Sequence, residues 1–151
     1  MMFKVRIFLM TSYKGLRKSS GYYIGITEYE TAKGPATIET FDRMKDVTAN
    51  QLALTGLIKA LERLNKPCEI EIFTDSNHLE SALTQGWLKK WQEADWKTAK
   101  GEDVKNADIW RTLIEVIAPH SVDIRYQQKT EYSEWQRREL LRAIEKEEQN
   151  V

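Results

Sequence analysis

The chain has 151 residues, 41% of them hydrophobic, which suffices for one domain with its own core (residues 1–151) and excludes two full-sized domains. Lysine plus arginine and aspartate plus glutamate both number 23, so a strongly basic or acidic chain is excluded and any charged binding surface must be local. The single Cys68 excludes an intramolecular disulfide, and the first ten residues, interrupted by Lys4 and Arg6, cannot span a membrane, which predicts a cytoplasmic protein.

The first third of the chain favours β-structure. Apolar and β-branched residues predict three strands, the second and third in a hairpin, at residues 3–12, 21–30 and 34–43. Between the first two lies the polar stretch YKGLRKSSG, a turn that carries Lys14, Arg17 and Lys18 and no acid. This turn is either a phosphate-binding patch or an ordinary solvated loop.

The rest of the chain alternates helical and extended patterns. Leucine and isoleucine recur at helical spacing after Thr48, a predicted cap, until Asn65 and Pro67 end the helix. Further patterns predict strands at 69–75 and 121–127 and helices at 76–91, 107–118 and 131–148, with a loop at 98–106. The order βββαβααβα predicts a mixed α/β domain without internal repeats.

The stretch FTDSNHL, residues 73–79, ends one predicted strand and begins a helix. Asp75 follows the strand directly, so its carboxylate could serve chemistry. Alternatively, Asp75 or Ser76 caps the helix by accepting backbone N–H bonds. The residues alone leave both roles open.

The segment from 73 to 110 closely resembles type 1 ribonuclease H. The shared pattern is a Thr-Asp-Ser at a strand end, spaced tryptophans, a Trp-Lys-Thr, and a Val-Lys-Asn before a helix, and it is matched here by Thr74, Asp75 and Ser76, then Trp87, Trp91 and Trp96, then Lys97 and Thr98, then Val104, Lys105, Asn106 and Trp110. TANQLALTGLIKAL (48–61) resembles the first helix of the family. The resemblance implies a ribonuclease H-like fold, with a mixed five-stranded sheet and helices on both faces.

The family's activity depends on a set of carboxylates that this chain largely lacks. The resemblance implies cleavage of the RNA strand of an RNA/DNA hybrid by two Mg²⁺ ions, held by four carboxylates. Asp75 matches one of them, whereas Met10, Ala53 and Arg138 stand at the other three positions. No acid precedes Glu28 and none lies between Asp46 and Glu62, so no shift of the alignment restores the first two. We therefore expect no bound Mg²⁺ and no cofactor.

Two further predictions concern the surroundings of Asp75. Glu134 precedes Arg138 by one helical turn and is a weak candidate for a second acid. Arg138, or its neighbour Arg137, could form an ion pair with Asp75 in the space that the metal ions would occupy. The histidines, His78 and His120, are expected to be surface or edge residues, not catalysts.

The resemblance also assigns candidate substrate contacts. Thr48, Asn50 and Asn77 match family positions that hold phosphates and the minor groove of the hybrid, although each is equally suited to a cap or turn. The family's basic protrusion corresponds to residues 86–106, where four acids nearly cancel the lysines, which include Lys89, Lys90 and Lys97. The tryptophans there are expected to pack the protrusion onto the domain.

Three functions follow as hypotheses. The leading one is a catalytically inactive ribonuclease H-like protein, a pseudoenzyme, that binds an RNA/DNA hybrid or structured RNA without cleavage. The second is a scaffold that binds a protein partner through the former active-site face. The third is a weak or altered metal-dependent ribonuclease that relies on Asp75 and Glu134.

Overall fold

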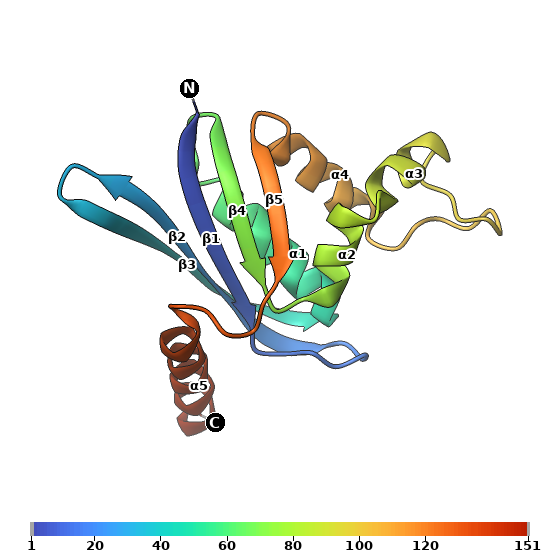
Figure 1. Cartoon of the computed structure of the whole chain (residues 1–151). Helices are drawn as coiled ribbons and strands as arrows, with labels where there is room; N and C mark the ends of the chain where they lie inside the picture. Colours follow the sequence, from blue (N-terminus) through green and yellow to red (C-terminus); the bar gives the residue numbers. More distant parts are fainter. Residues whose placement is uncertain (1, 151) are drawn as a thin grey trace.

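The computed structural model describes residues 2–150 and confirms the mixed five-stranded sheet (Figure 1). The strands are β1 (Phe3–Thr11), β2 (Ser19–Thr31), β3 (Gly34–Val47), β4 (Cys68–Thr74) and β5 (Ser121–Tyr126). They lie in the order β3-β2-β1-β4-β5, with β1 antiparallel to β2 and parallel to β4, and β4 parallel to β5. The carboxyl ends of the three parallel strands therefore meet at one end of the sheet, where open α/β sheets usually place their ligands.

The helices agree with the sequence prediction except at one place. They are α1 (Ala49–Leu61), α2 (Asn77–Thr84), α3 (Trp87–Glu93), α4 (Ala107–Ile117) and α5 (Ser133–Gln149). The single helix predicted over 76–91 is in fact α2 and α3, so the order is βββαβαααβα. Gly86 separates the two helices because it has a φ of 74°, a left-handed conformation that glycine adopts readily and that interrupts a right-handed helix.

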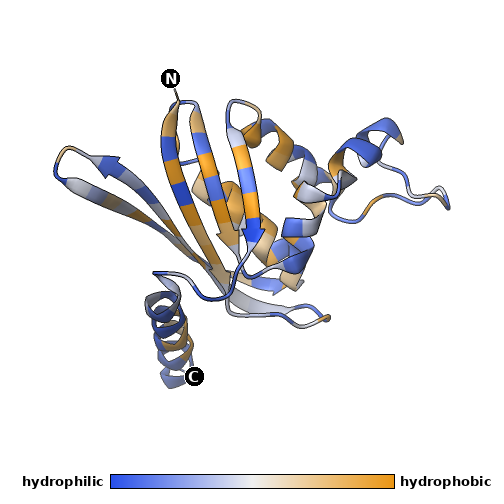
Figure 2. Ribbon diagram, viewed as in Figure 1, coloured by the Kyte–Doolittle hydropathy of each residue, from blue (hydrophilic) through white to orange (hydrophobic). Residues whose placement is uncertain are grey.

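Helices lie on both faces of the sheet, as expected, but α5 packs only against one end of its face, on β1 and β2. Successive side chains of a strand point to opposite sides, so each strand contributes to both faces. Val5, Ile7 and Leu9 of β1 face the main core under α1, α2 and α4. Phe8 and Met10 face the opposite side, where they belong to smaller apolar clusters closed by α5 and the residues before it. The alternation of apolar and polar residues along β1, β4 and β5 is visible in Figure 2.

Local signals fix the ends of the elements near the expected positions. The Thr48 hydroxyl accepts from the Gln51 backbone N–H at 3.1 Å, and the Gln51 side chain accepts from the Thr48 N–H at 2.9 Å. This reciprocal capping box starts α1. The hairpin between β2 and β3 turns at Gly34, whose φ of 111° suits glycine alone. Within residues 2–150 there is no helix with the length and apolar character needed to cross a membrane.

Candidate functional site

Asp75 lies directly after β4, at the end of the sheet where the parallel strands terminate. Its Oδ2 atom is 2.5 Å from the Lys14 ammonium and accepts from the Thr11 backbone N–H at 3.4 Å. Its Oδ1 atom is buried without a hydrogen-bond partner among the described residues. The cap of α2 is supplied by the next residue, Ser76, whose hydroxyl accepts from the Leu79 N–H at 3.2 Å. Asp75 is thus free of the capping role and engaged in an ion pair.

The partner of Asp75 comes from the loop after β1, so the predicted ion pair with Arg138 or Arg137 is wrong. Arg137 lines the same pocket as Asp75, whereas Arg138 and Glu134 line only an adjoining depression on the outer side of α5. The register of α5 explains this placement. Gln136 is buried against the sheet and donates to backbone carbonyls of β1 and β2 at 2.9 and 3.1 Å. A residue two positions further lies about 200° around the helix and therefore points away from the sheet.

The positions matched to the other two family carboxylates are apolar and buried. Met10 is 7% exposed and packs with Tyr22, Ile24 and Leu140, so the inner face of α5 covers the end of β1. Ala53 is 1% exposed and belongs to the main core beneath α1. A carboxylate at either position would displace apolar contacts. Burying such an unpaired charge costs on the order of several kcal/mol.

A pocket of about 340 Å³ lies where β1, β4 and α5 meet. Its lining combines apolar side chains of α5 with polar groups from the strand ends, namely Met10, Thr11, Ser12, Lys14, Asp75, Gln128, Arg137, Leu140, Leu141 and Ile144. Asp75 is the only carboxylate among these lining residues, and it faces two cationic side chains. Mg²⁺ requires several oxygen ligands in near-octahedral geometry. This donor set does not fit two Mg²⁺ ions, since its one acid is already held by an ammonium.

The loop from Ser12 to Lys18 presents the basic patch noted in the sequence. The Lys14 ammonium donates to the Thr11 hydroxyl at 2.8 Å in addition to its contact with Asp75, and half of the side chain remains exposed. Arg17 and Lys18 are exposed and form no ion pair with any residue between 2 and 150. Their charges are therefore available to an anionic partner.

The other predicted contact residues are distributed over two more places. The Thr48 hydroxyl is occupied by the hydrogen bond that caps α1. Asn50 and Asn77, by contrast, are exposed in the first turns of α1 and α2. The Gln51 side chain donates to the Asn106 side chain at 2.9 Å, which ties the start of α1 to the start of α4. Asn50 and Asn77 are thus placed for contact with a ligand, while Thr48 has a structural task.

The segment matched to the family's protrusion is held by aromatic packing. Neighbouring indole rings lie 5.4–6.1 Å apart in the cluster Trp87, Trp91, Trp96 and Trp110. Lys89 and Lys90 are exposed on α3, but Lys97 is paired with Asp103 across a short bridge in the following loop. The expected packing role of the tryptophans agrees with this arrangement, and part of the basic charge is cancelled.

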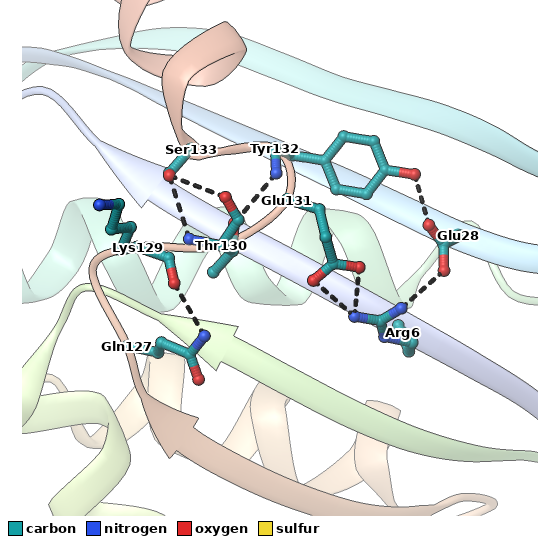
Figure 3. A network of polar contacts seen from close by, with 8 residues as sticks. All are labelled: Arg6, Glu28, Gln127, Lys129, Thr130, Glu131, Tyr132 and Ser133. Carbon is teal, nitrogen blue, oxygen red and sulfur yellow. Dashed lines mark hydrogen bonds and ion pairs between the residues drawn. The ribbon is translucent and has the colours of Figure 1, made fainter.

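An ionic network, which the sequence did not reveal, anchors the start of α5 to the sheet (Figure 3). The Arg6 guanidinium lies 3.0 Å from the Glu28 carboxylate and 2.6 Å from that of Glu131. The Tyr132 hydroxyl donates to Glu28, and this hydrogen bond, together with burial, raises the pKa of Tyr132 to about 12. The network joins residues more than 100 positions apart, which no local pattern could indicate.

The sheet face around Arg6 and Glu28 is acidic. It forms a shallow pocket at the amino ends of β1, β4 and β5, in which five carboxylates outnumber two cations, with the charged lining Lys4, Arg6, Glu28, Glu30, Glu69, Glu71 and Asp123. The two ends of the same face therefore carry opposite charge, which the zero net charge of the chain conceals.

Both histidines have internal partners. The Nδ1 atom of His120 accepts from the Cys68 backbone N–H at 2.9 Å, and His78 packs against Trp87 and Trp110. Burial lowers the pKa of both imidazoles. Neither histidine lines the pocket around Asp75.

Comparison with known proteins identifies the relatives of this chain. A family model described as RNase H matches residues 4–128. Ribonuclease H of Thermus thermophilus is 42% identical over 79 residues, which are 52% of this chain and 48% of that protein. Ribonuclease H of Chlorobium phaeobacteroides is 44% identical over 75 residues, 50% of this chain and 51% of that protein. The chain spans about half the length of the curated relatives it matches.

Solved structures share the fold at lower identity. LC9-RNase H1, described as a type 1 RNase H with the type 2 active-site motif, has a TM-score of 0.79 at 19% identity, over 95% of this chain and 72% of that one. LC11-RNase H1, solved in complex with an RNA/DNA hybrid, has a TM-score of 0.61 at 13% identity, over 93% of this chain and 99% of that one. At these identities the likeness establishes the fold alone.

Proposed function

Because the chain belongs to the RNase H family, we propose that it binds an RNA/DNA hybrid or structured RNA at the carboxyl ends of β1 and β4, without cleaving it. The observation that carries this proposal is the state of Asp75. The single family carboxylate that remains is held by the Lys14 ammonium at 2.5 Å, in a pocket to which no other carboxylate contributes among the lining residues. A two-metal mechanism needs several converging acids to hold both ions.

The charge distribution supports a nucleic acid as the ligand. Lys14 of the β1–β2 loop and Arg137 of α5 line the same pocket at the end of the sheet. Arg17 and Lys18 are exposed further along that loop, which projects beyond the strand ends on the side away from α5 (Figure 1). Backbone recognition of nucleic acids depends on such local cations, and a relative of the same fold has been solved with an RNA/DNA hybrid. Hybrids and structured RNA are recognised mainly through shape, phosphates and 2′-hydroxyls, which needs no catalytic metal.

The proposal is tested with one labelled RNA/DNA hybrid, in which cleavage and gel shift are measured in the same samples. The hybrid is incubated with the chain in EDTA, Mg²⁺ or Mn²⁺, at low and at moderate salt. We expect a salt-sensitive shift that requires no divalent ion, and an intact RNA strand in all three. A matched double-stranded DNA and a single-stranded RNA serve as competitors that define the preferred form.

The variant Asp75→Asn, which keeps the side-chain shape and removes the charge, is the matched control. Metal-dependent cleavage that Asp75→Asn abolishes would overturn the proposal in favour of a ribonuclease. That second candidate is favoured by the names of the curated relatives and by the unpartnered Oδ1 of Asp75, a buried oxygen that a cation would satisfy. Neither shift nor cleavage would overturn both and direct attention to a protein partner at the same face.

A further inference from the structure

We propose that Lys14 serves as a built-in cation that bridges Asp75 and a phosphate of the bound nucleic acid, with Arg137 as the second contact to that phosphate. The inference rests on the proposed function and names the atoms through which the site holds its ligand. It concerns a lysine of the β1–β2 loop, at a point in the fold where a carboxylate, an ammonium and a guanidinium border one pocket.

The coordination of the Lys14 ammonium leaves one donor free. An ammonium has three N–H donors. One contacts the Oδ2 atom of Asp75 at 2.5 Å and another the Thr11 hydroxyl at 2.8 Å. The side chain of Lys14 is 50% exposed, whereas that of Asp75 is 10% exposed, so the carboxylate lies at the floor and the ammonium above it. Because half of the lysine side chain is open to solvent, we infer that the third donor is accessible to a phosphate oxygen.

Electrostatics favours an anion over a cation at this position. With Asp75 neutralised by Lys14, the remaining charge of the pocket lining is that of Arg137, which forms no ion pair with any described residue. Arg17 and Lys18 add positive charge in the same loop. A guanidinium matches two phosphate oxygens in its fork geometry, and an ammonium acts as a point charge on a third.

Asp75 gives the lysine its position. A free lysine side chain loses much rotamer entropy when it binds a ligand, so a partner that already holds it lowers this loss. The carboxylate and the Thr11 hydroxyl together fix the ammonium at the carboxyl ends of β1 and β4. The arrangement carboxylate, cation, phosphate is the one that a metal ion would create, but here the cation is covalently part of the chain.

The experiment measures the affinity for an RNA/DNA hybrid in EDTA over a range of salt concentrations, for the unaltered chain and for Lys14→Met, Arg137→Gln and Lys33→Met. Lys33 is the matched control, because it loses the same charge in the β2–β3 turn at the opposite end of the sheet (Figure 1). We expect Lys14→Met and Arg137→Gln each to weaken binding about tenfold and to lower the salt slope by about one unit. Lys33→Met should leave both unchanged.

A second measurement separates a bridging lysine from a merely structural one. In Lys14→Met the carboxylate of Asp75 loses its ammonium, so added Mg²⁺ should recover part of the lost affinity for the hybrid. The double variant Lys14→Met/Asp75→Asn should show no recovery, and the unaltered chain should gain no affinity from Mg²⁺. Melting curves of all variants establish that the fold is kept.

The outcomes distinguish the two proposals. If the unaltered chain binds the hybrid but Lys14→Met behaves like Lys33→Met, the bridging lysine is refuted and the proposed function stands. If Lys14→Met weakens binding without changing the salt slope and without Mg²⁺ recovery, Lys14 acts only through local structure, and the inference again fails. If the unaltered chain does not bind the hybrid at any salt concentration, both proposals are overturned.

Discussion

Replacing Met10 by aspartate tests whether the end of β1 tolerates a carboxylate beneath α5. Met10 is 7% exposed, packs with Leu140 of α5, and lines the same pocket as Asp75. The variant Met10→Asp therefore places a second carboxylate near Asp75 and removes an apolar side chain from under α5. We expect a large loss of stability that Mg²⁺ partly restores.

The size of the effect follows from burial. Exposing or deleting a buried methionine loses about 1.5–3 kcal/mol of apolar transfer free energy. A carboxylate left without full solvation or pairing adds about 1–3 kcal/mol. The expected loss in the free energy of unfolding is thus about 4 kcal/mol, against a typical total of about 5–15 kcal/mol for a domain of this kind. The variant should remain folded without denaturant but unfold at a much lower urea concentration than the unaltered chain.

The assay is equilibrium urea unfolding with and without Mg²⁺, with Met10→Leu and Met10→Asn as controls for apolar volume and for charge. A Mg²⁺ concentration of about one hundred times the dissociation constant would add about 2.7 kcal/mol to Met10→Asp alone. Equal stability of Met10→Asp and Met10→Leu would refute the packing of Met10 beneath α5. A similar Mg²⁺ effect on the unaltered chain would refute the conclusion that its donor set does not fit the ion.

Three further outcomes follow from the contacts. The pKa of Tyr132, raised to about 12 by its hydrogen bond to Glu28, means that the folded state keeps a proton that the unfolded state releases near pH 10. The stability advantage over Tyr132→Phe, measured by urea unfolding, should therefore be full below pH 10 and vanish as the pH rises through 12. The pKa of His120 is lowered by burial, and its Nδ1 accepts from the Cys68 N–H. Its contribution to the free energy of unfolding should therefore be present above pH 6.5 and be lost as the pH falls through the lowered pKa. The stability of His120→Ala, measured by urea unfolding, should not show this pH dependence. In Gly56→Ala an added methyl would lie 2.9 Å from an aromatic side chain of β2, so thermal unfolding should show a loss of about 1–3 kcal/mol, less about 1 kcal/mol gained from helix propensity.

The elements were predictable from the sequence because their signals are local. Apolar and β-branched residues predicted β1, and Thr48 was predicted as the cap that precedes α1, which its hydrogen bond from Gln51 confirms. The helix predicted over 76–91 failed at Gly86, where a left-handed φ divides it. A glycine inside a helical pattern is often tolerated, so the sequence could not indicate that this one ends a helix.

The sequence indicated which residues to examine around Asp75, but not which cation forms an ion pair with it. The resemblance directed attention to Met10 and Ala53, and both are buried in apolar surroundings where an acid would be unfavourable. The partner of Asp75 was missed, because Lys14 lies 61 positions earlier in a loop that sequence patterns describe only as basic. A long, flexible lysine can approach a carboxylate from many directions, whereas the register of α5, set by the buried Gln136, keeps Arg138 away.

The opposite charges at the two ends of one sheet face decide how a polyanion can approach. Carboxylates surround Arg6 at the amino ends of β1, β4 and β5, while Lys14 and Arg137 lie at the carboxyl ends of β1 and β4. At about 0.1 M salt the Debye length is about 10 Å, so each end acts on a ligand nearly independently of the other. The proposed nucleic-acid ligand should therefore be attracted to the end of the sheet and repelled by the acidic pocket on its face. Under the proposed function, a chain without net charge thus has one end suited to phosphates, and a bound duplex should cross the strand ends instead of lying along the strands.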